Sequence, residues 1–191
     1  METPDRVSHA PATDAIPPQD PDKPTGLVIR VSTGSGAGPT RLAAFDTAVQ
    51  AAGIAGYNII RLSSVIPSQS VVRQVTGGDQ VKGSHGDVVY CVYAAAYASM
   101  PGEQAWAGLA WATHADGSGA GIFVEHTAAS ESVLRRDLAA TIDTMSLTRG
   151  HLYQVAGQIV STAICVDHPA CAVAVAVYGT AGWRTLIDPE G

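Results

Sequence analysis

The sequence predicts an α+β fold in which strands outnumber helices. Hydrophobic residues make up 46% of the 191 residues and charged residues only 15%, which is typical of a chain with a substantial core. Short apolar runs rich in β-branched residues alternate with Gly, Pro and Asp turns, and two segments show helical spacing. Their order is too irregular for a regular βαβ array, so we expect a layered α+β sandwich.

The first half of the ordered chain begins with a strand over residues 26–33, followed by a glycine-rich loop over 34–40. A helix follows over 41–53, and the next strand occupies 57–63. The apolar residues that recur at helical spacing in this helix are Leu42, Phe45, Val49 and Ala52.

The second half contains further strands and the clearest helix of the chain, over residues 130–150. Ser130 or Ser132 can cap its beginning and Gly150 its end. The strands that we expect here cover 87–100, 104–114, 120–127, 158–166 and 171–179.

Residues 1–25 differ in composition from the rest of the chain. They hold six of the eleven prolines, mixed with Asp and Gln, and this composition cannot form a packed core. We therefore expect a disordered tail over 1–25 and a single domain over 26–191. The tail has no apolar segment typical of a signal peptide, and no stretch is long and apolar enough to cross a membrane, so the cytoplasm is the expected location.

The net charge bears on the class of partner, and the cysteine count bears on disulfide bonding. The net charge is −6 and no Lys/Arg cluster is present, which argues against nucleic acid and weakly favours a small cationic molecule. Three cysteines do not form the even set typical of a secreted disulfide framework.

A nucleotide site is one interpretation of the glycine-rich loop. Gly34, Gly36 and Gly38 follow a strand and precede a helix, an arrangement that can bind phosphate. Pro39 stands where the last glycine of the dinucleotide fingerprint would be, and no acidic residue ends the next strand. We therefore predict no nucleotide cofactor.

A metal site is one interpretation of the segment "CVDHPAC". Cys165, His168 and Cys171 are possible zinc ligands, but a hairpin with incidental cysteines explains the segment equally well, and no fourth ligand is nearby. We predict no metal.

Paired serines and two acids are the remaining candidates. Ser63 and Ser64 end an apolar run, where serines ordinarily form turns, although a hydroxyl there can also attack the neighbouring peptide bond. Glu125 ends the run 122–124, and the local sequence alone favours a solvent-exposed carboxylate over one that carries a proton. Asp46 lies in the middle of a helix, either on its exposed face or as a ligand-binding residue.

The segments "LAAFDTAVQAAGIAGYNIIRLSSVIP", "MPGE" and "GIFVEHT" together resemble the pyruvoyl-dependent arginine decarboxylase family, over Leu27 to Tyr178. The most specific part is a helix with an "AFD" core followed at a fixed distance by "N-x-x-R-x-S-S-x-x-P". The resemblance implies a four-layer αββα sandwich. It also implies a homotrimer, or a dimer of trimers, with active sites between neighbouring protomers.

The resemblance implies that the chain makes its own cofactor by cleavage between Ser63 and Ser64. The Ser64 hydroxyl would attack the carbonyl carbon of Ser63, and β-elimination of the resulting ester would leave dehydroalanine. Loss of ammonia would then give a pyruvoyl group at position 64, and chains of residues 1–63 and 64–191. Asn58 matches the family's asparagine, whose amide can donate to the developing oxyanion.

The resemblance also implies the reaction, in which L-arginine forms a Schiff base with the pyruvoyl ketone and loses CO2 to give agmatine. Glu125 matches the family's proton donor, which reverses the preference given above for a solvent-exposed carboxylate. Asp46 matches the acid that binds the substrate's guanidinium.

Two alternatives remain open. The substrate can be another cationic amino acid, because one acid at position 46 does not separate arginine from lysine. The chain can also be a relative that does not cleave and serves as a binding or structural subunit. The presence of Ser63, Ser64, Asn58 and Glu125 together argues against this second alternative.

Overall fold

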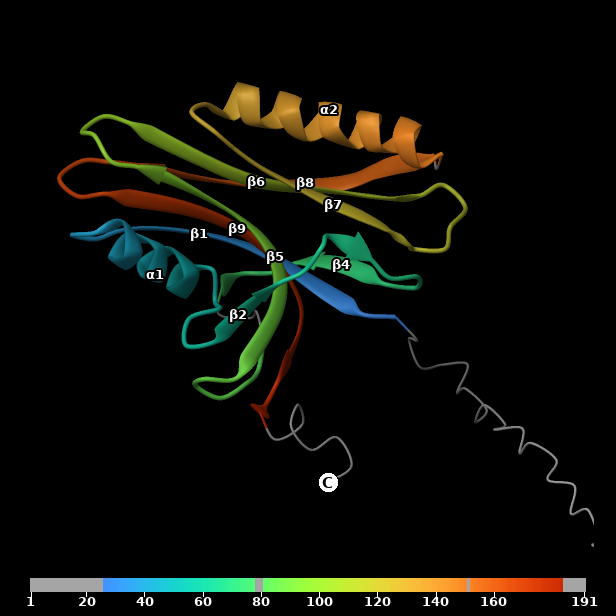
Figure 1. The fold of residues 1–191 in the computed structure, drawn as a ribbon, viewed down its shortest axis with the longest axis horizontal. Coiled ribbons are helices and arrows are strands. Elements are labelled where there is room, and N and C mark those ends of the chain that lie inside the picture. The colour runs from blue at the N-terminus through green and yellow to red at the C-terminus, as the bar shows by residue number, and fades with distance from the viewer. Residues whose placement is uncertain (1–25, 78–80, 151, 184–191) are drawn as a thin grey trace, which may run out of the picture.

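The computed structural model of the protein describes residues 26–77, 81–150 and 152–183. Within these residues the chain forms two helices and two β-sheets that face each other (Figure 1). Helix α1 (Arg41–Ala51) covers the outer face of one sheet, and α2 (Glu131–Arg149) covers the outer face of the other. This mixed α+β arrangement is compatible with the sandwich that the sequence predicts.

The sheet next to α1 has five strands. Two inner ladders, β5–β9 and β9–β1, are antiparallel, whereas the two edge strands pair in parallel. From edge to edge the strands are β2 (Asn58–Arg61), β5 (Val88–Ala98), β9 (Ala170–Ala181), β1 (Val28–Ala37) and β4 (Val71–Gln74).

The sheet next to α2 has four strands, and all of its ladders are antiparallel. The strands are β3 (Val65–Ile66), β7 (Gly121–Ala128), β6 (Gln104–His114) and β8 (Tyr153–Ile164). Because β3 has only two residues, it pairs with the beginning of β7 and leaves the rest of that edge without a partner in the described chain.

The core lies in three layers, and strand β9 shows why its sequence is apolar at every position. Val173, Val175 and Val177 pack against α1, whereas Ala174 and Ala176 face the other sheet. Successive side chains of a strand point to opposite faces, so a strand covered on both faces must be apolar throughout. The third layer packs α2 against the four-stranded sheet through its buried side chains Leu134, Leu138 and Ile142.

The predicted loop over 34–40 is wrong for residues 34–37, which continue strand β1 and pair with β9 as far as Ala37. The glycines allow α1 to lie directly on this strand. A Cβ atom on Gly34 would overlap the backbone carbonyl oxygen of Ala48, and one on Gly36 would lie 2.5 Å from Cβ of Thr47. Glycine here permits close packing of helix and strand.

The predicted helix over 41–53 is confirmed, but the prediction of its buried face is partly wrong. Leu42 is 77% exposed and Phe45 is half-buried, whereas the buried residues include Ala44 and Ala48. Small residues face the sheet because the glycines of β1 bring the helix too close for larger ones. The large side chains therefore lie at the surface, next to the hollows described below.

Most of the other predicted elements are confirmed. Helix α2 begins at Ser130, whose side chain accepts a hydrogen bond from the Val133 amide, and ends at Gly150 with φ 66°. The strands predicted over 87–100, 104–114, 120–127 and 171–179 correspond to β5, β6, β7 and β9.

The remaining differences between the predicted and observed elements lie at the ends of strands and in short edge strands. Strand β8 begins at Tyr153, five residues before its predicted start at 158. Strand β2 spans Asn58–Arg61 and so is shorter than the predicted 57–63, and the short strands β3 and β4 were not predicted. The predicted disordered tail over 1–25 lies outside the described residues. Among those that are described, neither helix is long and apolar enough to span a membrane.

Candidate active site

The two serines lie where the chain passes from one sheet to the other. Just before them, the Leu62 amide donates to the Cys91 carbonyl of β5, at 2.9 Å, which keeps that residue beside the five-stranded sheet. Just after, the Phe123 amide of β7 donates to the Ser64 carbonyl at 2.8 Å, which begins the pairing of the other sheet. The Ser63–Ser64 peptide bond is therefore the link between two layers of the core.

The backbone at this link is strained. Ser64 has φ 66°, a left-handed conformation in which an L-residue other than glycine is uncommon. Such a conformation costs on the order of 1–3 kcal/mol and persists only where the surroundings hold it. At Ser64 it is held by the pairing of the next two residues, Val65 and Ile66, with β7.

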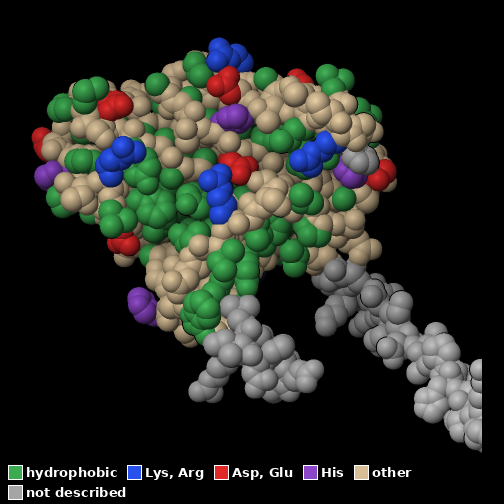
Figure 2. All heavy atoms as spheres, in the orientation of Figure 1, with side chains coloured by type: hydrophobic (Ala, Val, Ile, Leu, Met, Phe, Trp, Pro, Cys, Tyr) green, Lys and Arg blue, Asp and Glu red, His purple; other side chains and the backbone are tan. Residues whose placement is uncertain are grey.

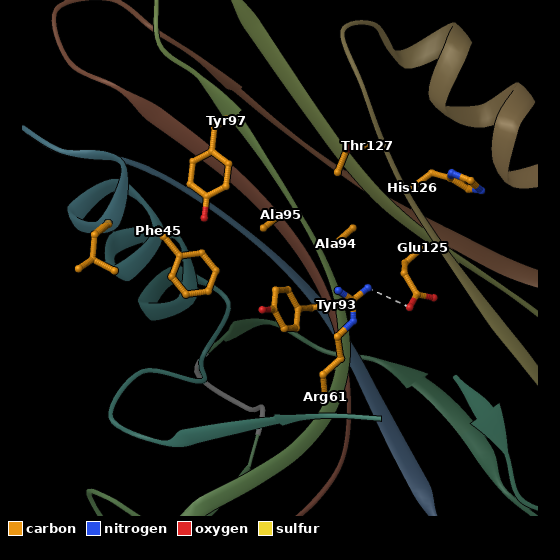
Figure 3. A pocket seen from close by; sticks show the side chains of 10 residues that line it. Phe45, Arg61, Tyr93, Ala94, Ala95, Tyr97, Glu125, His126 and Thr127 are labelled. Atoms are coloured by element: carbon orange, nitrogen blue, oxygen red, sulfur yellow. Dashed lines mark hydrogen bonds and ion pairs between the residues drawn. The ribbon is translucent and has the colours of Figure 1, made fainter. Parts of the chain in front are cut away.

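The Ser64 hydroxyl points at a carboxylate. Its Oγ lies 2.9 Å from Oε1 and 3.0 Å from Oε2 of Glu125, so the hydroxyl donates to this acid. The Arg61 guanidinium donates to the same Oε1 at 3.1 Å and lies 5.2 Å from the ring centre of Tyr93. Figure 3 shows the carboxylate turned toward Arg61, with the imidazole of His126 pointing away toward α2.

Two hollows meet at this group. The smaller, of about 350 Å³, contains both serines together with Arg61, Glu125 and, from α2, Thr141, Met145 and Arg149. The larger, of about 670 Å³, shares Arg61, Glu125 and His126 with the first and extends toward α1. Its aromatic wall consists of Phe45, Tyr93 and Tyr97 (Figure 3).

Tyr178 supports the strained backbone at Ser64 through the residue that follows it, Val65. Its hydroxyl donates to the Val65 carbonyl at 2.9 Å, and its ring packs edge-on against Phe123. Burial raises the pKa of the Tyr178 hydroxyl well above its usual value, and the negative charge of Glu125 raises it further. Tyr178 therefore stays protonated and acts as a fixed donor to the backbone beside Ser64.

His126 is held by α2. Its Nε2 lies 2.7 Å from Oγ1 of Thr141, and that hydroxyl donates to the Asp137 carbonyl at 2.8 Å. The single proton of the threonine hydroxyl is thus already used, so Nε2 of His126 must be the donor to Thr141. The hydrogen bond fixes the imidazole on the side of β7 opposite to Glu125.

Asn58 and Asp46 lie elsewhere in the same chain. The Asn58 amide donates to the Gly86 carbonyl at 2.6 Å, at the far end of β2 from the serines. Asp46 is exposed on α1 and lines a separate hollow of about 520 Å³. Within one chain the structure thus brings together Ser63, Ser64 and Glu125, but neither Asn58 nor Asp46 joins them.

The cysteines do not form a cluster with the histidines. Cys165 and Cys171 are both buried and unpaired, and no group of three potential metal ligands occurs among the described residues. Burial raises the pKa of the Cys171 thiol to about 11 and that of Cys91 to about 12. Both are therefore neutral apolar core side chains at physiological pH.

Arg61 is the residue of this site whose role we did not infer from the sequence. Arginine and lysine residues are scattered along the chain, and on the face drawn in Figure 2 they also lie far apart as single residues. Arg61 stands two residues before Ser63, and in the strand predicted over 57–63 that spacing would place the two side chains on one face. This spacing is a signal that could have identified it.

The fold and the site together define a two-sheet α+β protein whose distinguishing feature is a strained Ser–Ser step bonded to a carboxylate. Comparison with known proteins gives the family. The sequence profile of the pyruvoyl-dependent arginine decarboxylases matches residues 28–182. The chain therefore belongs to this family.

Individual relatives agree with the profile. A pyruvoyl-dependent arginine decarboxylase of Halobacterium salinarum is 40% identical over 116 residues, which cover 61% of this chain and 68% of the relative. That of Methanococcoides burtonii is 28% identical over 149 residues, covering 69% and 82%. That of Methanothermobacter thermautotrophicus is 26% identical over 155 residues, covering 74% and 97%.

Proposed function

We propose that the chain cuts itself between Ser63 and Ser64 and then decarboxylates L-arginine to agmatine and CO2. The observation that carries this proposal is the contact of the Ser64 hydroxyl, on a strained backbone, with both oxygens of Glu125. A serine that only ended a strand would need neither the left-handed conformation nor a partly buried acid as its hydrogen-bond partner.

Self-cleavage begins with attack of Oγ of Ser64 on the carbonyl carbon of Ser63. The C–N bond breaks, the hydroxyl proton passes to the nitrogen, and an ester joins the two residues. Removal of the Cα proton of residue 64 then breaks its Cβ–Oγ bond, and the electron pair stays on the oxygen as part of a carboxylate on Ser63. Addition of water to the imine form of dehydroalanine and loss of ammonia leave a ketone.

The surroundings of Ser64 fit a pyruvoyl group at that position. The Phe123 amide holds the residue 64 carbonyl, which survives the reaction, and the half-buried hollow leaves the position open to a small molecule. A pyruvoyl group supplies an electron-accepting carbonyl that stabilises the negative charge left when CO2 departs.

Glu125 delivers the proton to the former α-carbon of the substrate. Its carboxylate already contacts the side chain of residue 64, so it lies within hydrogen-bond reach of a substrate bound there. Arg61 holds Oε1 of Glu125 and so fixes the acid, and the buried ring of Phe123 lines the same hollow.

Substrate recognition is proposed to use Asp46 and two protomers. A guanidinium binds a carboxylate through two parallel hydrogen bonds, which suits arginine to an exposed aspartate. Since Asp46 and Ser64 line different hollows of one chain, a homotrimer would complete the site by bringing the Asp46 hollow of one protomer to Ser64 of the next. Asn58, on the edge strand β2, is proposed to reach the oxyanion of a site completed by two protomers. The exposed side chain of Leu42, on the same helix, supports a covered surface there.

The test is the mass of the purified protein under denaturing conditions, followed by assays with arginine and, as a matched cation, lysine. The expected result is two chains, residues 1–63 and 64–191, with the longer one lighter by one ammonia than its hydrolysis product. CO2 should be released from arginine, with agmatine as the amine product, and not from lysine. A single chain of 19.6 kDa after long incubation would instead favour a relative that does not cleave. Light scattering of the native protein tests the trimer.

A further inference from the structure

Cleavage at this site creates a problem of like charge. Oγ of Ser64 lies 2.9 and 3.0 Å from the two carboxylate oxygens of Glu125. In the proposed function, on which this inference rests, that oxygen leaves residue 64 and becomes a carboxylate oxygen of Ser63. Two carboxylates would then stand about 3 Å apart, a separation at which both cannot stay ionised unless a cation binds one of them.

The charged or ionisable side chains of the hollow that contains the serines are Arg61, Glu125, His126 and Arg149. Arg61 already binds Glu125 at 3.1 Å. His126 donates from Nε2 to Thr141, and its imidazole points away from Glu125 toward α2 (Figure 3). The remaining cation is Arg149, for which no ion pair with another described residue is found.

Helix α2 aims Arg149 into this hollow. Thr141, Met145 and Arg149 follow one another at intervals of four, which places them on one face of the helix, and all three line the hollow. Arg149 is the last residue of α2, and Gly150 in the left-handed conformation ends the helix there. The C-terminal end of a helix carries a partial negative charge, so the backbone there does not attract an anion. An anion at this end of α2 therefore needs the positive charge of the Arg149 side chain.

We propose that Arg149 binds the carboxylate that forms at Ser63 and draws it away from Glu125. The negative charge appears when the Cβ–Oγ bond of residue 64 breaks, as the electron pair moves onto the departing oxygen. A cation near Ser63 therefore stabilises the transition state of the elimination as well as its product. It acts on the second step of self-cleavage, after the ester has formed.

The experiment follows self-cleavage of freshly purified Arg149→Gln, Arg149→Lys and wild-type protein. Samples are taken at intervals, treated with hydroxylamine and analysed by intact mass. Hydroxylamine cuts the ester and leaves a hydroxamate on Ser63 and an unmodified Ser64 at the new N-terminus, whereas completed elimination leaves a carboxylate and no serine amine. The matched control is Arg136→Gln, on the same helix, where the arginine binds Asp137 at 2.9 Å away from the hollow.

Arg149→Gln should complete cleavage roughly tenfold more slowly than wild type, with more hydroxamate at early times. Arg149→Lys should restore most of the rate, and Arg136→Gln should match wild type. An unchanged rate and ester fraction in Arg149→Gln, or an equal loss in Arg136→Gln, would overturn the proposal. Wild-type protein that yields neither cleaved chains nor hydroxamate would refute the proposed function itself.

A second measurement separates charge binding from helix stability. In an uncut Ser64→Ala background, Arg149→Gln should lower the thermal midpoint no more than Arg136→Gln does. In the cleaved protein it should lower the midpoint further, because only there is the Ser63 carboxylate present. Equal shifts in the cut and uncut proteins would contradict the proposal.

Discussion

Replacement of Glu125 by glutamine separates the two proposed reactions of the site. The substitution keeps the shape of the side chain and an oxygen that accepts hydrogen bonds, so the contact with the Ser64 hydroxyl can persist. It removes the proton that the acid would give to the former α-carbon. We expect the chain to cut normally and the decarboxylation of arginine to fall by about a hundredfold or more, the usual contribution of a general acid.

The effect on stability should be small. The ion pair that is lost joins Glu125 to Arg61, whose side chain is 54% exposed, and pairs of this kind contribute about 1 kcal/mol or less. For a chain of this size that corresponds to a fall in the thermal midpoint of no more than about 4 °C. A large fall in kcat therefore could not be ascribed to unfolding.

Two assays check this prediction. Intact mass under denaturing conditions measures cleavage, and CO2 released from carboxyl-labelled arginine measures turnover at saturating substrate. A Glu125→Gln protein that is processed and fully active would exclude Glu125 as the proton donor. A variant that remains uncut would show that the acid is needed in the first reaction, contrary to our expectation.

Four further predictions address other parts of the chain. Ser64→Ala removes the nucleophile, so the protein should remain a single chain in denaturing gels, and any cut product would refute the proposed attack. Asp46→Asn should leave cleavage intact but raise KM for arginine by roughly tenfold or more, through loss of a charge-assisted hydrogen bond, while an unchanged KM would remove this residue from substrate binding. Gly34→Ala should cost about 2 kcal/mol by forcing α1 off the strand, measured as urea unfolding against Gly179→Ala, whose Cβ meets nothing within 4 Å. Because burial raises the pKa of Cys91 to about 12, iodoacetamide should not label it in the folded protein at mildly alkaline pH but should label it in urea, and rapid native labelling would contradict its burial.

The sequence was informative where a local pattern determines structure. Helix α2 was predicted with its caps because Ser130, the apolar spacing and Gly150 are all local signals. The apolar strands β5 and β9 were recognisable for the same reason. The class of fold therefore followed from composition and periodicity.

The errors came from contacts between segments distant in the chain. The glycines at the end of β1 are typical of a loop, and only the helix that packs on them explains why they are strand residues. The same packing made the prediction for α1 partly wrong. Val49 and Ala52 are buried, but close approach selects Ala44 and Ala48 beside them and leaves Leu42 outside.

The site was predictable only in part. The serine pair was found through its resemblance to a family, but nothing local links Ser64 to Glu125, which lies 61 positions further along the chain. The crossing of the chain between two sheets brings these residues together, and it also gives Arg61 its partner. Such a contact depends on the register of β3 with β7, which two residues determine.

The order of strands determines what holds the protein together after a cut at Ser63. The shorter product would carry β1 and β2, which belong to the five-stranded sheet, and α1, which covers its outer face. Strand β1 is an inner strand, paired on one side with β9 and on the other with β4, both from the longer product. Strand β2 also pairs with β5 of the longer product, so separation would require breaking three ladders and exposing the apolar residues beneath α1. The two products would therefore unfold as one cooperative unit, with a single denaturation transition despite the missing peptide bond.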